Sequence, residues 1–263
     1  MRRVKDSRWP APKRVIAIAC QPRSGSTLLA AALNSTGAAG FCDEMTNAHL
    51  LFEGTRRRGE YLFWARLQVS KWWHRLRARR LRGSTKVSRR LALEYVERYP
   101  ARAMSADGVL AVKQFWQVYR LIMIDNGLDM HHWGVPVVWV RLVRADRVAQ
   151  AVSLVRAQQS QQWLWNQRAV GTPEYDDDRI SAALRGIDEG ERGWDDYFTR
   201  IGVQPLVIEY TELDEHYDET IRRIFDHVGL SDHPVPAQGT RRQRNAESDQ
   251  WIGRYQAAHP GVE

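Results

Sequence analysis

The chain has 263 residues, 43% of them hydrophobic and 27% charged, which is enough to bury a sizeable core, and we expect one domain over 1–263 with a flexible tail at 1–13. Its longest apolar runs, Val15 to Cys20 and Val135 to Val140, are far shorter than the roughly 20 residues that cross a bilayer, so we expect no membrane span, no secretory signal and a cytoplasmic protein. Two cysteines and eight histidines without paired spacing argue against a disulfide framework and a zinc site, and we predict no metal.

The positive charge of the chain is concentrated in one stretch. The formal net charge is +8, and the segment from Arg56 to Arg102 alone holds fifteen Lys or Arg against three Glu. Such a surplus attracts phosphate groups, nucleic acid or an anionic membrane surface. The rest of the chain is acidic on balance.

The first elements along the chain are a strand and a helix joined by a short polar turn. The apolar run Val15 to Cys20 predicts the strand, and apolar residues recur at helical spacing from Leu28 until Gly37 ends the pattern. Further strands are predicted at Val109 to Lys113, Pro136 to Leu142 and Pro205 to Tyr210.

Helical patterns separate these strands. They cover Glu60 to Arg82, Ser88 to Tyr99, Phe115 to Asn126, Arg147 to Arg168, Asp178 to Gly202, Tyr217 to Val228 and Glu247 to Ala258. The alternation predicts an α/β fold, in which a central parallel sheet is flanked by helices on both faces.

The turn between the first strand and helix has the composition of an anion-binding loop. Amide N–H groups at the start of a helix lack partners within it, and the helix dipole adds a partial positive charge. Gly25 permits close approach of the backbone, Ser24, Ser26 and Thr27 add hydroxyl donors, and Arg23 adds charge. An ordinary turn capped by Ser24 is the alternative interpretation.

Two common nucleotide loops do not fit this turn. A nucleoside-triphosphate P-loop needs Gly-x-x-x-x-Gly-Lys-Ser/Thr, and here the Lys is absent and one Gly replaces two. The Gly-x-Gly-x-x-Gly fingerprint of dinucleotide-binding folds is also absent. A loop for a less charged leaving group, without a metal, fits better.

Five blocks in register carry a resemblance to a known family. They are the loop with Gly40 to Glu44, Ala111 to Lys113 with Trp116, Val140 to Ser153, Tyr210 with Leu213, and Arg242 and Gln243 running to Trp251 and Tyr255. Together they resemble the bacterial sulfotransferases of the trehalose 2-sulfotransferase type, and the likeness spans nearly the whole chain. It implies a P-loop-like sulfotransferase fold, the donor 3'-phosphoadenosine 5'-phosphosulfate (PAPS), the product 3'-phosphoadenosine 5'-phosphate (PAP), and a homodimer.

The resemblance also assigns the donor-binding residues. Arg23, Ser24, Gly25, Ser26 and Thr27 would hold the 5'-phosphosulfate. The 3'-phosphate would lie between Arg144, at the end of a strand, and Ser153, on the next helix, because both can converge beyond the carboxyl edge of the sheet. A solvated surface charge and a helix-face hydroxyl are the alternatives for these two. Arg242 would close over the nucleotide.

Sulfuryl transfer further requires a base and a positive charge at the leaving oxygen. The resemblance makes Glu44 the base, and the alternative is an ordinary loop carboxylate beside Asp43. Arg23 stands where many sulfotransferases have lysine, and it should stabilise the bridging oxygen as the S–O bond breaks. Lys113 would contact the sulfate or the acceptor, or else be a strand-end lysine whose stem packs on apolar surface.

The acceptor is expected to be a carbohydrate, a glycolipid or a glycosylated metabolite, since Trp116, Trp163 and Trp165 near the matched blocks could pack against a sugar. For the basic segment 71–82, three interpretations stay open: a solvated helix, peripheral contact with a membrane that carries the acceptor, or a dimer or nucleic-acid contact. A P-loop kinase and a nucleic-acid-binding module are the alternative functions, although we expect no nucleic-acid partner.

Overall fold

The computed structural model describes residues 9–46, 89–164, 166–239 and 245–261. The chain divides into two compact units. The first unit comprises 1–18 and 36–139, and the second comprises 19–35 and 140–263. Strands β1 and β4 each run through both units.

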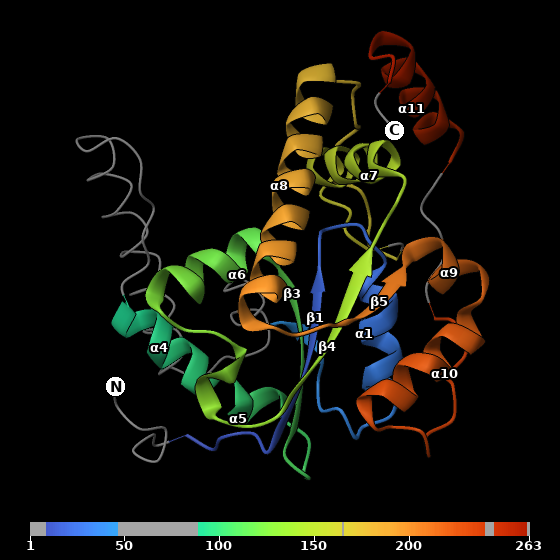
Figure 1. Ribbon diagram of the computed structural model, residues 1–263. Helices are drawn as coiled ribbons and strands as arrows, with labels where there is room; N and C mark the ends of the chain where they lie inside the picture. The colour runs from blue at the N-terminus through green and yellow to red at the C-terminus, as the bar shows by residue number, and fades with distance from the viewer. Residues whose placement is uncertain (1–8, 47–88, 165, 240–244, 262–263) are drawn as a thin grey trace. The chain divides into compact units, whose positions relative to one another are not determined.

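Five short strands form one sheet in the order β2-β3-β1-β4-β5 (Figure 1). They span Arg14–Cys20 (β1), Asp43–Glu44 (β2), Val109–Phe115 (β3), Val137–Val143 (β4) and Leu206–Glu209 (β5). The pairs β2–β3 and β4–β5 are parallel. Strand β1 lies in the middle, between β3 and β4, which both follow it in the chain. The strand order therefore runs in opposite directions on the two sides of β1, and open α/β sheets bind ligands beyond the carboxyl ends of their strands at such a point.

In the first unit, α5 (Pro100–Ala103) and α6 (Trp116–Ile122) pack against β3. Helix α4 (Arg89–Arg98) packs on α5, and the 3-10 turn η2 (Ile124–Asn126) packs on α6. A second 3-10 turn, η3, spans Met130–Trp133. The Tyr119 ring is fully buried against Trp139, and its hydroxyl accepts a hydrogen bond from the amide of Met130 at 3.2 Å. The buried apolar side chains of β3 and α6 thus supply much of the core of this unit.

In the second unit, α7, α8 and α11 lie together, and α10 packs on α9 and β5 (Figure 1). The helices span Ser26–Ser35 (α1), Arg147–Ser160 (α7), Asp177–Ile201 (α8), Tyr210–Glu215 (α9), Tyr217–Val228 (α10) and Ala246–Ala258 (α11). One face of α7, with Val148, Val152 and Val155, packs in a cluster with Ile180 and Leu184 of α8. Because that face is apolar, the opposite face of α7 is left for polar residues.

All four predicted strands and most of the predicted helices match the structure. The prediction of a helix to Arg168 is wrong: α7 ends at Ser160, because Gln161 adopts the left-handed conformation (φ 57°) and caps the helix. Strand β2 and helix α9 were not predicted. The predicted helix 60–82 lies outside the described residues.

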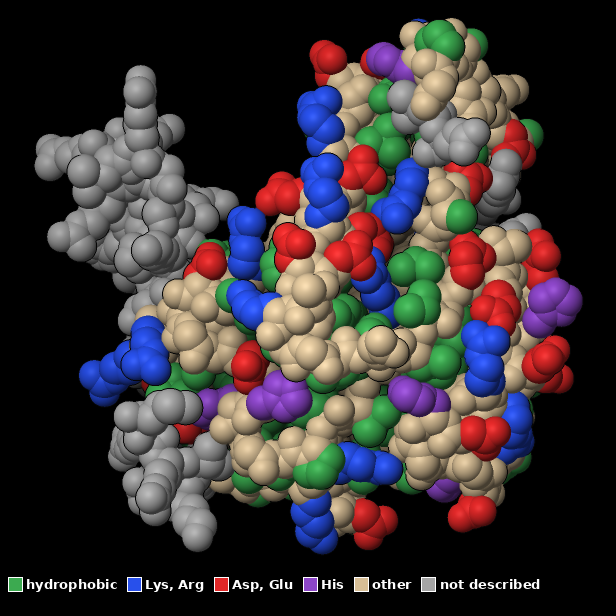
Figure 2. Space-filling view, viewed as in Figure 1, with side chains coloured by type: hydrophobic (Ala, Val, Ile, Leu, Met, Phe, Trp, Pro, Cys, Tyr) green, Lys and Arg blue, Asp and Glu red, His purple; other side chains and the backbone are tan. Residues whose placement is uncertain are grey.

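Helix α8 carries charged side chains of both signs, and Figure 2 shows acidic and basic side chains close together on the face toward the viewer. The concentrated basic stretch lies mostly within 47–88, outside the described residues. Across the described helices, none is both long enough and apolar enough to traverse a bilayer.

Candidate functional site

The loop between β1 and α1 has an unusual backbone. Arg23 has φ 66° and Gly25 has φ 86°, and Arg23 is one of two non-glycine residues in the described ranges with a positive φ. Such a conformation costs a residue with a Cβ about 1–3 kcal/mol, and it concentrates at functional sites. Within the described part of the chain, no carbonyl accepts the N–H groups of Ser26 and Thr27 at the start of α1. These amides are therefore available to an anion.

The side chains predicted to hold the two ends of the donor lie together. The Arg23 guanidinium donates from Nε to the Ser153 hydroxyl at 2.9 Å and from Nη1 to the Trp163 carbonyl at 2.9 Å. Arg144 donates to the Arg23 carbonyl at 3.0 Å, and its guanidinium lies 4.8 Å from the centre of the Tyr210 ring. Burial, and after it the charge of Arg144, lower the pKa of Arg23. Three segments that are far apart in sequence thus make one basic site.

Two loop carbonyls next to Arg23 are also bound. The Ser24 hydroxyl donates to the Gln21 carbonyl at 2.8 Å, so in this structure it serves the loop itself. The Gln150 side chain donates to the Pro22 carbonyl at 2.8 Å. Both donors are fully buried.

Gly25 lies against the ring of Tyr210. A Cβ at this position would be 2.7 Å from Cδ2 of the ring, closer than real contacts allow. A residue without a side chain is required here both by this approach and by the positive φ.

A second group of predicted residues lies in the first unit. In the parallel register of β2 and β3, Glu44 is opposite Lys113, and their side chains form an ion pair at 3.4 Å. Only 17% of the Glu44 side chain and 8% of the Lys113 side chain are exposed. The Asp43 carboxylate accepts the amide of Glu44 at 2.8 Å and so fixes the backbone of β2. Lys113 is a buried partner of the candidate base.

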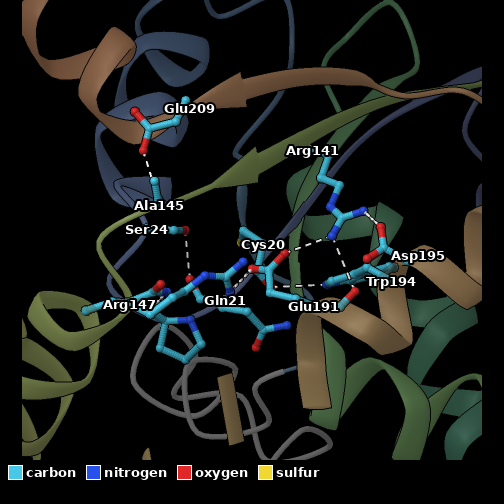
Figure 3. A network of polar contacts seen from close by, with 12 residues as sticks. Cys20, Gln21, Ser24, Arg141, Ala145, Arg147, Glu191, Trp194, Asp195 and Glu209 are labelled. Atoms are coloured by element: carbon cyan, nitrogen blue, oxygen red, sulfur yellow. Dashed lines mark hydrogen bonds and ion pairs between the residues drawn. The ribbon is translucent and has the colours of Figure 1, made fainter. Parts of the chain in front are cut away.

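A buried charge network beside the loop was missed by sequence reasoning (Figure 3). Glu191 of α8, 5% exposed, pairs with Arg141 at 2.8 Å and with Arg147 at 3.6 Å, and Arg141 also bonds Asp195. Removing one partner of a buried pair typically costs about 3–5 kcal/mol. Glu191 lies in the apolar register of α8, and a charge at such a position is the signal that could have revealed it.

Gly190 brings α8 against the first residue of the loop. A Cβ there would be 2.2 Å from the side-chain nitrogen of Gln21, which is fully buried. The interior glycine of a long helix was the sequence signal for this close approach.

Of the remaining predicted residues, two lie outside the described part of the chain and one is buried in the core. Arg242 and Trp165 fall outside the described residues, so their roles stay predictions. Trp116 is buried at 7% exposure, whereas Trp163 is 42% exposed. Of the two described tryptophans, Trp163 is the one exposed to solvent.

Comparison with known proteins defines the class. The family model of the Stf0 sulphotransferases matches residues 15–258. The chain therefore belongs to the Stf0 sulphotransferase family. This confirms the resemblance seen in the sequence, and the parallel sheet with flanking helices confirms the expected fold class.

Two curated relatives are trehalose 2-sulfotransferases. The protein from Mycobacterium tuberculosis is 33% identical over 129 residues, and the one from Mycolicibacterium smegmatis is 29% identical over 124 residues. The matches cover 47% and 46% of both partners, so the chain spans about half the length of the curated relatives it matches. Among solved structures, the sulfotransferase domain of the Synechococcus PCC 7002 olefin synthase is similar at 14% identity with a TM-score of 0.45, covering 95% of this chain and 98% of that one.

Proposed function

We propose that this chain transfers a sulfuryl group from PAPS to a hydroxyl of a carbohydrate, a glycolipid or a glycosylated metabolite. The observation that carries the proposal is the meeting of Arg23, Arg144 and Ser153 at one loop, in a chain that belongs to a sulphotransferase family. The relatives' name, trehalose 2-sulfotransferase, supports a sugar acceptor.

The residues at the loop fit a donor with two anionic ends. The amides of Ser26 and Thr27 with Arg23 suit a 5'-phosphosulfate, because main-chain donors and a planar cation can share its oxygens. Arg144 and Ser153, on the α7 side of the loop, suit a 3'-phosphate. The loop has no lysine for a triphosphate, which argues against a P-loop kinase.

In the proposed reaction, the acceptor hydroxyl attacks the sulfur in line with the bridging oxygen. The new O–S bond forms as the bond from sulfur to the phosphate oxygen breaks, and PAP leaves with the electron pair. The Glu44 carboxylate takes the hydroxyl proton, while Arg23 offsets the charge on the leaving oxygen. Glu44 and the loop belong to different units, and their joint action is part of the proposal, supported by family membership.

The remaining parts of the proposal concern assembly and place. We propose a cytoplasmic homodimer, with peripheral membrane contact through 71–82 where the acceptor is lipid-linked. The composition of that segment, which combines Trp with Arg, supports the membrane contact.

Transfer of labelled sulfate tests the proposal directly. The purified protein, incubated with PAPS labelled with ³⁵S and a panel of free sugars, glycolipids and glycosylated metabolites, is expected to label at least one of them and to release PAP in equal amount. Mass spectrometry of the product then identifies the ester. Failure to label any sugar-containing compound, with PAPS intact, would contradict the proposed activity.

A further inference from the structure

Three consecutive carbonyls at the start of the loop are each held by a side-chain donor. The Gln21 carbonyl accepts from Ser24 at 2.8 Å, the Pro22 carbonyl from Gln150 at 2.8 Å and the Arg23 carbonyl from Arg144 at 3.0 Å. Two of these donors come from distant parts of the chain. The start of the loop is thus fixed from outside.

Holding a carbonyl also fixes the amide of the same peptide. A peptide unit is planar and trans, so its C=O and N–H point in opposite directions. When Gln150 holds the Pro22 carbonyl, the N–H of Arg23 is turned to the other side, and Arg144 orients the N–H of Ser24 likewise. An anion loop needs its amides inward and its carbonyls away, because a carbonyl dipole facing an anion repels it.

We infer that Gln150 is a positioning residue for the 5'-phosphosulfate loop. Its side chain is 0% exposed and therefore does not reach a ligand that enters from solvent. It would act on the donor indirectly, through its hydrogen bond to the Pro22 carbonyl. Its Oε1 is buried and has no hydrogen-bond partner among the residues that the structure describes. A buried acceptor without a partner destabilises the fold, and an apolar side chain would avoid that cost. The hydrogen bond from the Gln150 amide to the Pro22 carbonyl explains why a polar side chain stands at this buried position.

Helix α7 places this bond one turn from the predicted 3'-phosphate contact. Gln150 and Ser153 are three residues apart, and such residues lie on the same face of a helix. The apolar face of α7 is fixed against α8, so the helix forms a rigid link between the two anion positions. On the proposed function, Gln150 therefore sets the distance between the 5' and 3' ends of the donor site.

The variant Gln150→Met tests this role, because methionine keeps the length of the side chain but removes the N–H donor. Calorimetry of the full chain with three nucleotides is the measurement. We expect PAP and adenosine 5'-monophosphate to bind the variant about tenfold more weakly than they bind the wild type. Adenosine 3'-monophosphate, which does not use the loop, is expected to bind unchanged.

Gln158→Leu is the matched control, since Gln158 is exposed about two turns further along α7. It should leave all three affinities unchanged. Gln150→Leu is the second variant and should repeat the result of Gln150→Met. Equal losses for all three nucleotides, no loss for any, or unfolding of both variants would overturn the inference. Failure of the wild type to bind PAP would instead overturn the proposed function, and this inference with it.

Discussion

Replacing Glu44 by glutamine is expected to abolish sulfuryl transfer while leaving the affinity for PAP nearly unchanged. Glutamine keeps the shape and a carbonyl oxygen for Lys113, 3.4 Å away, but it cannot accept the hydroxyl proton. General-base catalysis contributes about 10²–10⁴-fold, and we expect kcat to fall by about 10³-fold. Steady-state rates with labelled donor measure the loss, and calorimetry measures PAP binding.

Asp43→Asn is the control for this experiment. The amide oxygen of asparagine can still accept the hydrogen bond from the Glu44 backbone, now recorded at 2.8 Å, so only the charge is removed. We expect kcat to change by a few-fold at most. Glu44 would not be the base if Glu44→Gln kept normal turnover, or if Asp43→Asn lowered kcat more than Glu44→Gln does.

Gly25→Ala is expected to have the largest effect on donor binding. The new Cβ would be 2.7 Å from the Tyr210 ring, at a backbone φ of 86° that alanine tolerates poorly. Either the loop or the ring must move, and Arg144 lies over the same ring. Strain of about 1–3 kcal/mol, expressed as lost affinity, weakens PAP binding by about 10–100-fold in calorimetry.

The matched control is Gly37→Ala, where φ is also positive, at 64°, and no atom lies within 4 Å of the added Cβ. This variant carries the same backbone strain without the collision, and we expect wild-type affinity for PAP. If Gly25→Ala bound PAP as the wild type does, the loop would not be where the donor binds.

The parts of the fold that the sequence predicted are those encoded by local patterns. Apolar runs identified β1, β3, β4 and β5: β1 and β3 are buried nearly throughout, and β4 and β5 are apolar in sequence although partly exposed. Strand β2 has two residues, Asp43 and Glu44, and neither is apolar, so periodicity had nothing to detect. The end of α7 was missed because it depends on one residue, Gln161, adopting a left-handed conformation.

The candidate site was predicted where residues stand at the ends of elements. Arg23 follows β1, Arg144 directly follows β4, and Ser153 lies on the next helix, so topology brings them to the same edge. The contacts of Gln150 with Pro22 and of Gly190 with Gln21 join segments that are far apart in sequence. An interior glycine can indicate that another segment approaches a helix closely, but no local pattern says which residue is the partner.

For Glu44 and Lys113 too, the sequence indicated the two residues but not the contact between them. Each residue was predicted separately from its family block, one as the base and the other as a contact to sulfate or acceptor. Their mutual ion pair follows from the parallel register of β2 on β3, which requires knowing that β2 exists. The register places the Lys113 ammonium against the Glu44 carboxylate, a contact that the sequence did not predict.

The proposed binding of an adenine nucleotide by the loop and α7 is tested most directly by calorimetry with PAP and with adenosine 5'-diphosphate in buffer free of divalent metal. We predict strong binding of PAP and an affinity at least about 100-fold lower for the nucleotide without a phosphate on the ribose 3' oxygen, because Arg144 and Ser153 would lose their anion. Equal affinity for the two would contradict the account.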